Sequence, residues 1–255
     1  MSDRVASTYF EPAGPRVLAH RGLALDAPEN TLLAFAKAIA VGADYLETDV
    51  HASHDGIAVV SHDPSLERVA GRKVDVGQLT MHELGRIDLG HGQNFSSLEA
   101  ALDAFPDARF NIDVKESAAV EPTIAAIART RSAGRVLLTS FSERRRRRLA
   151  ELAPGAVTSV GGAGVLRFRN AAFLRSPASA TRALRGGLAL QIPERTGPLR
   201  LVTRPLVDLA HRVGAEVHVW TVNDPDDMTR LLDLGVDGLV TDRADLAMEI
   251  VSARS

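Results

Sequence analysis

The stretch RVLAHRGLALDAPENTLLAFAKAIAVGADYLETDV, residues 16–50, contains two short apolar runs separated by a segment with helical spacing. Residues 16–20 and 45–50 have the length and composition of strands. Between them, Asn30 is a candidate N-cap, apolar residues recur every three or four positions, and Gly42 can end the helix. The stretch therefore predicts a strand, a covering helix and a second strand.

The same alternation continues along the chain. Further strands are expected at residues 109–114, 135–140, 156–160, 188–192, 216–221 and 238–241. Eight strands alternating with helices in 255 residues predict an α/β fold, a (β/α)8 TIM barrel that forms a single domain over residues 1–255. An open doubly wound sheet is the alternative, because periodicity does not show whether a sheet closes.

One additional β-rich run, residues 56–61, follows the second strand too closely to be its parallel neighbour. The dipeptide Asp55-Gly56 is typical of a two-residue hairpin turn, which would pair Val50 with Ser61. That hairpin would return His62 to a position beside Asp49.

Composition excludes several classes of function. The net charge is −2 and the sequence has no cysteine, so we expect no nucleic-acid partner, no disulfide and no thiolate zinc site. No apolar run reaches signal-peptide length or the roughly 20 residues of a membrane span, so we expect a soluble cytoplasmic protein. The five arginines at 144–148 are expected on an exposed helix face, and the glycine-rich segment from Gly161 is expected to be a loop.

Residues two apart on a strand point to the same face of the sheet. Glu47 and Asp49 would both point into the barrel, where two carboxylates repel each other unless a cation lies between them. A hard divalent ion with oxygen ligands fits that position. Asp113 and Lys115 share a face in the same way.

Ionisable side chains gather at the carboxyl ends of the expected strands, where barrels of this kind carry their function. The candidates are His20, Arg21, Glu47, Asp49, Asp113, Lys115 and Trp220, with His62 returned by the hairpin. Arginine and lysine suit phosphate oxygens, a carboxylate-bound metal polarises a phosphoryl group, and two histidines can supply one acid and one base. This set favours hydrolysis of a phosphodiester, with Trp220 as an apolar wall for the organic part.

Several motifs make the chain resemble the glycerophosphodiester phosphodiesterase family, which belongs to the phospholipase C-like phosphodiesterase barrels. HRG at 20–22 is followed by PENT, ETDV, VVSHD, NIDVK, VWTVND and GVDGLVTDRAD in the family's order. The resemblance covers about residues 16–246. It implies a small insertion after the HD motif, at residues 64–95, beside the mouth of the barrel.

The resemblance also implies residue roles and a reaction. His20 and His62 would be the catalytic acid and base, Glu47, Asp49 and Asp113 would bind Ca²⁺ or Mg²⁺, and Arg21 and Lys115 would bind phosphate. The products would be glycerol 3-phosphate and an alcohol. Two departures from the family pattern are Asp113, where glutamate is usual, and LALDA at 23–27, which replaces a small glycine-containing run.

Two other functions remain open at this stage. A lysophospholipase D-type enzyme would use the same chemistry on a lipid phosphodiester and would need an apolar surface at the mouth. A catalytically silent barrel would bind a phosphate ligand without turnover. The headgroup, the metal, the individual roles of the histidines and the oligomeric state are not specified by the sequence.

Overall fold

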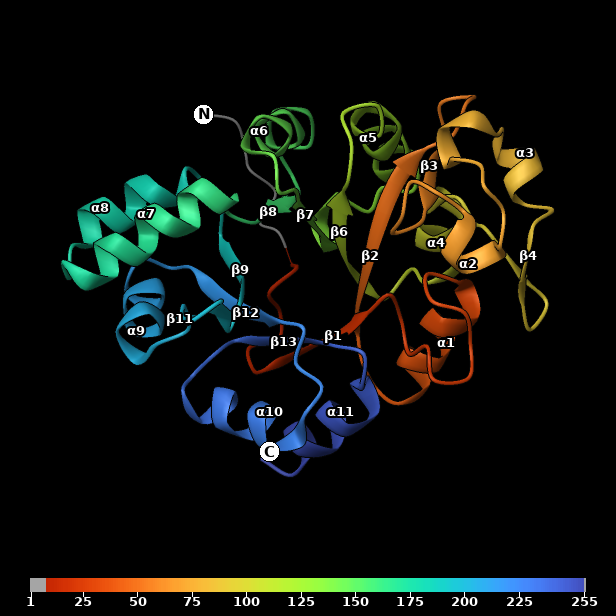
Figure 1. Cartoon of the computed structure of the whole chain (residues 1–255). Helices are drawn as coiled ribbons and strands as arrows, with labels where there is room; N and C mark the ends of the chain where they lie inside the picture. The colour runs from red at the N-terminus through yellow and green to blue at the C-terminus, as the bar shows by residue number, and fades with distance from the viewer. Residues whose placement is uncertain (1–7, 255) are drawn as a thin grey trace.

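The computed structural model describes residues 8–254, and its centre is a barrel of eight parallel strands (Figure 1). The strands are β1 (Arg16–His20), β2 (Tyr45–Ala52), β6 (Arg109–Val114), β7 (Val136–Thr139), β8 (Val157–Thr158), β9 (Ala189–Pro193), β12 (Glu216–Trp220) and β13 (Gly238–Thr241). Their order is β8-β7-β6-β2-β1-β13-β12-β9, and a parallel bridge between Ser159 and Ala189 joins the two ends. All eight expected strands and the (β/α)8 barrel are thus confirmed, and the open sheet is excluded.

Helices follow the strands and surround the barrel in Figure 1. They are α1 (Leu32–Ala40), α4 (Leu98–Ala104), α5 (Val120–Arg129), α6 (Glu143–Leu152), α7 (Gly162–Phe173), α8 (Pro177–Leu184), α9 (Arg204–Arg212), α10 (Pro225–Asp233) and α11 (Ala244–Ser252). No helix within residues 8–254 is long and apolar enough to cross a membrane.

The main core lies between the strands and the helices. Leu46 and Phe110 point outward from β2 and β6 and are fully buried, and Phe35 of α1 meets Phe110 edge to face at 5.9 Å. Burying one such aromatic side chain contributes about 2–3 kcal/mol. With the outward positions filled by apolar residues, the alternate positions of each strand are left to point into the barrel.

A smaller core closes the end of the barrel opposite the strand carboxyl termini. Tyr9 is fully buried there against Leu18 and Tyr45, and its carbonyl accepts a hydrogen bond of 2.7 Å from the Tyr45 hydroxyl. Because this end is filled by side chains, the barrel opens only at its other end.

The hairpin after β2 forms, but its predicted register is wrong by one residue. Strand β3 (Ala58–Val60) pairs antiparallel with β2, with Val50 opposite Val60 instead of Ser61. The loop has three residues, since the amide of Ser53 bonds to the carbonyl of Ile57 and Gly56 has φ +73°. A left-handed glycine at the third loop position is typical of a three-residue turn with a bulge, and the extra residue shifts the partners.

Residues 64–95 fold beside β3 as short elements. These are α2 (Glu67–Ala70), the 3-10 turn η1 (Val76–Gln78), α3 (Met81–Leu84), β4 (Asp88–Gly90) and β5 (Gln93–Asn94). They share a separate core in which Leu66 and Leu84 pack on Val59 of β3. Two further short segments, the 3-10 turn η2 (Ala133–Arg135) and the two-stranded sheet of β10 (Arg195–Thr196) and β11 (Leu199–Arg200), lie in loops of the barrel.

Two expectations about helices are wrong. The glycine-rich segment is helix α7 rather than a loop, because Gly164 allows α7 to pack closely: a Cβ there would lie 3.0 Å from the Ala183 carbonyl oxygen of α8. The arginines of α6 are not all exposed, since Arg146 is 2% exposed and binds both carboxylate oxygens of Glu143 at 3.0 Å.

Candidate active site

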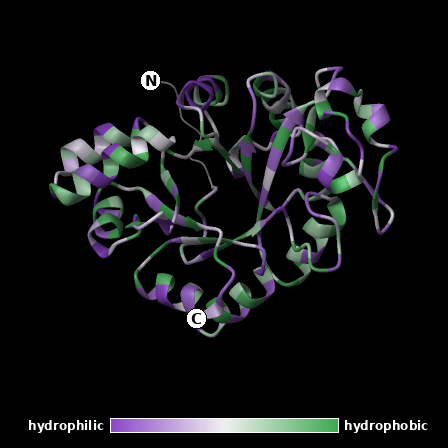
Figure 2. Cartoon of the chain, in the orientation of Figure 1, coloured by the Kyte–Doolittle hydropathy of each residue, from purple (hydrophilic) through white to green (hydrophobic). Residues whose placement is uncertain are grey.

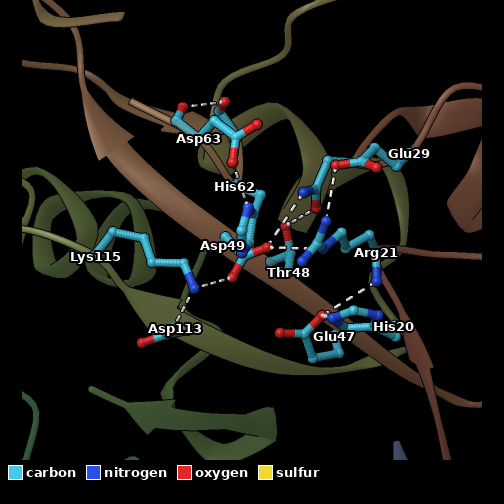
Figure 3. Close-up of polar contacts among 12 residues, drawn as sticks. His20, Arg21, Glu29, Glu47, Thr48, Asp49, His62, Asp63, Asp113 and Lys115 are labelled. Carbon is cyan, nitrogen blue, oxygen red and sulfur yellow. Dashed lines mark hydrogen bonds and ion pairs between the residues drawn. The ribbon is translucent and has the colours of Figure 1, made fainter. Parts of the chain in front are cut away.

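A cavity of about 470 Å³ opens at the carboxyl ends of the barrel strands. All eight residues singled out from the sequence line it: His20, Arg21, Glu47, Asp49, His62, Asp113, Lys115 and Trp220. Figure 3 shows the charged members of this group converging from β1, β2, β6 and the segment after β3. A second cavity of about 370 Å³ lies under the insertion, and His62 lines both cavities.

His20 stands at the end of β1 and is held by a carboxylate from the end of β13. Its Nδ1 donates to Asp242 Oδ1 at 2.6 Å, which leaves Nε2 on the side of Glu47, 4.0 Å from Oε2. Burial alone lowers the pKa of His20, but the hydrogen bond to Asp242 and the charge of Glu47 outweigh it, so the pKa lies above its usual value.

Asp242 is itself oriented by Asn223, a residue of the loop after β12. Asn223 Nδ2 donates to Asp242 Oδ2 at 2.7 Å, and Asn223 Oδ1 accepts from the Asp242 amide at 2.9 Å. Both residues lie in motifs visible in the sequence, but the contact of Asp242 with His20 joins chain positions more than 200 residues apart. Sequence spacing gives no sign of such a contact.

His62 is held in the same manner by its neighbour in the chain. Its Nδ1 donates to Asp63 Oδ1 at 2.7 Å, and Asp63 is in turn an ion-pair partner of Arg68 in α2. A histidine whose Nδ1–H is fixed by a carboxylate presents Nε2 for proton transfer. The Nδ1 atom of each histidine is therefore held by an aspartate. The partner of His62 could have been found from the sequence, because Asp63 follows it directly in the HD dipeptide.

Three carboxylates lie close together on the inner face of β2 and β6. Lys115 Nζ bridges Asp49 and Asp113 at 2.7 Å each, while the side chain of Glu47 accepts a hydrogen bond from the Arg21 amide at 3.1 Å. Burial and the charge of Asp49 raise the pKa of Glu47 to about 8, and burial raises the pKa of Asp113. Asp113 Oδ1 is buried and has no hydrogen-bond partner among the described residues.

These carboxylates have the chemistry of a divalent-cation site, because their oxygens carry more negative charge than their neighbours neutralise. Within residues 8–254, however, no three metal-ligating side chains are arranged to hold an ion. The ammonium group of Lys115 lies between Asp49 and Asp113 and supplies the positive charge between these two carboxylates.

The PENT segment orients the other side of the site. Arg21 has φ +59°, and its guanidinium reaches Glu29 at 3.1 Å and Asp49 at 3.5 Å. Asn30 was expected to cap α1, which is wrong: its side chain accepts from Thr48 at 2.8 Å and donates to Asp49 at 3.4 Å. Thr31 is the cap, since its hydroxyl accepts from the Ala34 amide at 3.3 Å. Asn30, with φ +56°, turns away from the helix to hold the carboxylate.

The wall opposite the histidines is apolar. Trp220 and Phe141 meet edge to face at 6.1 Å, and Lys115 Nζ lies 5.9 Å from the centre of the Phe141 ring. Leu166 of α7 continues this wall toward the solvent. The cavity thus has one charged half and one apolar half.

The fold and the cavity define a TIM-barrel protein whose site combines two histidines, an arginine, a lysine and clustered carboxylates. Residues 20–246 match the profile of the Glycerophosphoryl diester phosphodiesterase family. The chain is 42% identical to "Probable glycerophosphodiester phosphodiesterase 2" of Mycobacterium tuberculosis, over 100% of this chain and 98% of the relative. The chain therefore belongs to the glycerophosphodiester phosphodiesterase family.

Two other comparisons agree with that assignment. A crystal structure of glycerophosphodiester phosphodiesterase from Thermotoga maritima superposes with a TM-score of 0.73 at 27% identity, covering 92% of this chain and 98% of the other. Human "Lysophospholipase D GDPD1" is 36% identical, over 38% of this chain and 35% of the relative.

Proposed function

We propose that this protein is a metal-dependent phosphoric diester hydrolase that converts glycerophosphodiesters into glycerol 3-phosphate and an alcohol. The observation that carries the proposal is the pair of histidines, His20 and His62, each fixed through Nδ1 by a carboxylate and both lining one cavity with Arg21 and Lys115. Family membership and the 42% identical relative support the same reaction.

In this proposal the two histidines transfer protons on opposite sides of the phosphorus. One accepts the proton of the attacking water or substrate hydroxyl through Nε2, and the other donates a proton to the leaving alcohol oxygen. Their carboxylate partners keep Nδ1 protonated, so that Nε2 of each ring is the group that exchanges protons. Charge on the phosphoryl oxygens is compensated by Arg21 and Lys115.

We assign Glu47, Asp49 and Asp113 as the ligands of the divalent cation, Ca²⁺ or Mg²⁺. The unpartnered Asp113 Oδ1 and the raised pKa of Glu47 support this role, because a nearby cation would favour the ionised carboxylates. When bound, the ion would polarise the phosphoryl group and neutralise its charge. Trp220 and Phe141 would contact the organic part of the substrate.

We further propose that the substrate is a small molecule released in glycerophospholipid breakdown and that the reaction occurs in the cytoplasm. The absence of cysteine from the sequence is compatible with a reducing compartment. A second candidate is lysophospholipase D-type hydrolysis, which the apolar half of the cavity favours, and the partial similarity to the human lysophospholipase D supports it.

A substrate and metal panel tests these assignments. The purified chain is stripped with a chelator, then assayed for glycerol 3-phosphate or lysophosphatidate release after addition of Ca²⁺ or Mg²⁺. We expect turnover of glycerophosphocholine or glycerophosphoethanolamine with at least one of the ions. Preferred release of lysophosphatidate would identify the lipid reaction, and binding without turnover of any diester would show a silent phosphate-binding barrel.

A further inference from the structure

The helical hairpin formed by α7 and α8 projects from the barrel on the left of Figure 1. Its tip carries the most exposed apolar residues of the described chain that do not line the cavity: Phe173 is 88% exposed and Leu174 is 70% exposed. Large apolar side chains in contact with water are unfavourable, and where they cluster they mark a surface that binds an external partner.

The exposed apolar residues of α7 lie on one face of the helix. Leu166 and Phe173 are seven residues apart, which places them within about 20° of each other around a helix of 3.6 residues per turn. Another face of the helix, turned by roughly 100–150° and including Val165, Phe168 and Ala172, is buried against the rest of the protein. Because Leu166 also lines the cavity, this exposed face runs from the mouth of the site to the tip of the hairpin, with Leu166 at one end and Phe173 at the other.

The charge of the hairpin differs from that of the rest of the molecule. Residues 152–193 contain five arginines and no lysine, aspartate or glutamate, in a chain whose net charge is −2. The arginines are Arg167, Arg169, Arg175, Arg182 and Arg185. Among residues 8–254, only Arg185 of this group has a carboxylate partner, Glu143 at 3.8 Å.

Two of the arginines lie on α7 with the apolar residues. Arg169 is three residues from Leu166 and four from Phe173, so helical spacing places it beside both, and Arg167 is exposed one position after Leu166. In Figure 2, hydrophilic and hydrophobic ribbon segments alternate along this hairpin. Exposed apolar side chains flanked by arginines, of which four of the five have no carboxylate partner among residues 8–254, are the composition of segments that insert at the headgroup region of anionic membranes.

We propose that the α7–α8 hairpin docks on the surface of an anionic phospholipid bilayer, with Phe173 and Leu174 inserted among the lipids and the arginines on the phosphate groups. Charge favours this occupant over a second copy of the chain, since two such hairpins would bring like charges together. Docking would hold the mouth of the cavity near the lipid surface through Leu166. The proposal stands on the surface alone and does not depend on the reaction.

Vesicle sedimentation with the full chain tests the proposal. We expect binding to phosphatidylcholine vesicles that contain phosphatidylglycerol, little binding to pure phosphatidylcholine, and release at high salt. The double variant Phe173→Ser, Leu174→Ser should bind at least about tenfold more weakly. Reversing one arginine charge, as in Arg169→Glu, should weaken binding by about fivefold or more.

Matched controls separate docking from general effects. Val41→Ser and Arg72→Glu change an exposed apolar residue and an exposed arginine away from the hairpin and should leave vesicle binding unchanged. The circular dichroism spectrum and the Tm should be unchanged in all variants, which shows that they fold whether or not the chain hydrolyses a diester. The proposal is wrong if the wild-type chain does not bind anionic vesicles at low salt, or if the tip variants bind as well as wild type. It is also wrong if the only effect of the tip substitutions is to convert an oligomer of this chain into monomers.

Discussion

Replacing Asp242 by asparagine tests whether this carboxylate determines which nitrogen of His20 carries the proton. Asn223 cannot turn its amide over, because its Oδ1 already accepts from the Asp242 amide at 2.9 Å and from the Thr241 hydroxyl at 3.1 Å. Its Nδ2 therefore continues to point at the side chain of residue 242. An asparagine there would direct its oxygen toward Asn223 and its NH₂ group toward His20 Nδ1.

The consequence is a change of tautomer. With an NH₂ group as its neighbour, Nδ1 of His20 becomes an acceptor, and the neutral ring carries its proton on Nε2. Restoring the other tautomer requires breaking about one hydrogen bond in the substituted site, which costs about 1–3 kcal/mol, or about 5- to 160-fold in kcat. Loss of the carboxylate charge adds less, because the Asp242 side chain is 52% exposed and solvent screens it.

The assay is kcat for release of glycerol 3-phosphate from glycerophosphocholine at saturating metal. The exchange variant Asn223→Asp, Asp242→Asn is the decisive comparison, because the new carboxylate accepts from the NH₂ group and leaves the amide oxygen for His20 Nδ1. We expect it to recover most of the lost activity, whereas Asp245→Asn, a control in the first turn of the neighbouring helix α11, loses little. An unchanged kcat in Asp242→Asn, or no recovery in the exchange variant, would refute the reasoning.

Three further predictions concern stability. Arg146→Ala should lower the free energy of unfolding by about 3 kcal/mol, because it breaks a buried bidentate pair with Glu143, while the exposed Arg144→Ala should change it by less than about 0.5 kcal/mol. Urea denaturation compares the two, and equal losses would contradict the assignment. Thr31→Ala should cost about 1 kcal/mol through loss of the α1 cap, seen as a lower Tm. The pKa of Glu47 is raised from 4.5 to about 8, so the folded protein binds this proton more tightly than the unfolded chain. With metal removed by a chelator, the stabilisation that protonated Glu47 gives the folded protein is complete below about pH 4.5 and is lost as the pH rises through about 8. Glu47→Gln should therefore flatten the fall of Tm over this pH range. An equally steep fall of Tm in the variant would show that Glu47 does not cause it.

The strands and their faces were predictable from sequence because each depends on local patterns. Glu47 and Asp49 could be assigned to one inward face from a period of two residues, and the structure places both in the cavity. Closure of the barrel could not be assigned in this way, since the bridge between Ser159 and Ala189 joins distant segments.

The errors arose where a backbone conformation or a tertiary contact outweighed a local pattern. Gly56 adopts a left-handed conformation that lengthens the hairpin loop by one residue. Asn30 is a good capping residue by type, but it instead bonds to Thr48 and Asp49, and its neighbour in the chain caps the helix. Helix α7 begins in a glycine-rich segment because Gly164 permits close contact with α8, a requirement that propensity alone does not contain.

The central claim is that His20 and His62 together transfer the protons of phosphodiester hydrolysis. The most direct measurement is the rate of glycerol 3-phosphate release by the His20→Ala, His62→Ala double variant, with the divalent ion that best supports the wild-type protein. We predict a loss of at least about 10⁴-fold in kcat with an unchanged Tm, since each proton transfer contributes about 10²- to 10⁴-fold. Turnover by the folded double variant at the wild-type rate would contradict the account.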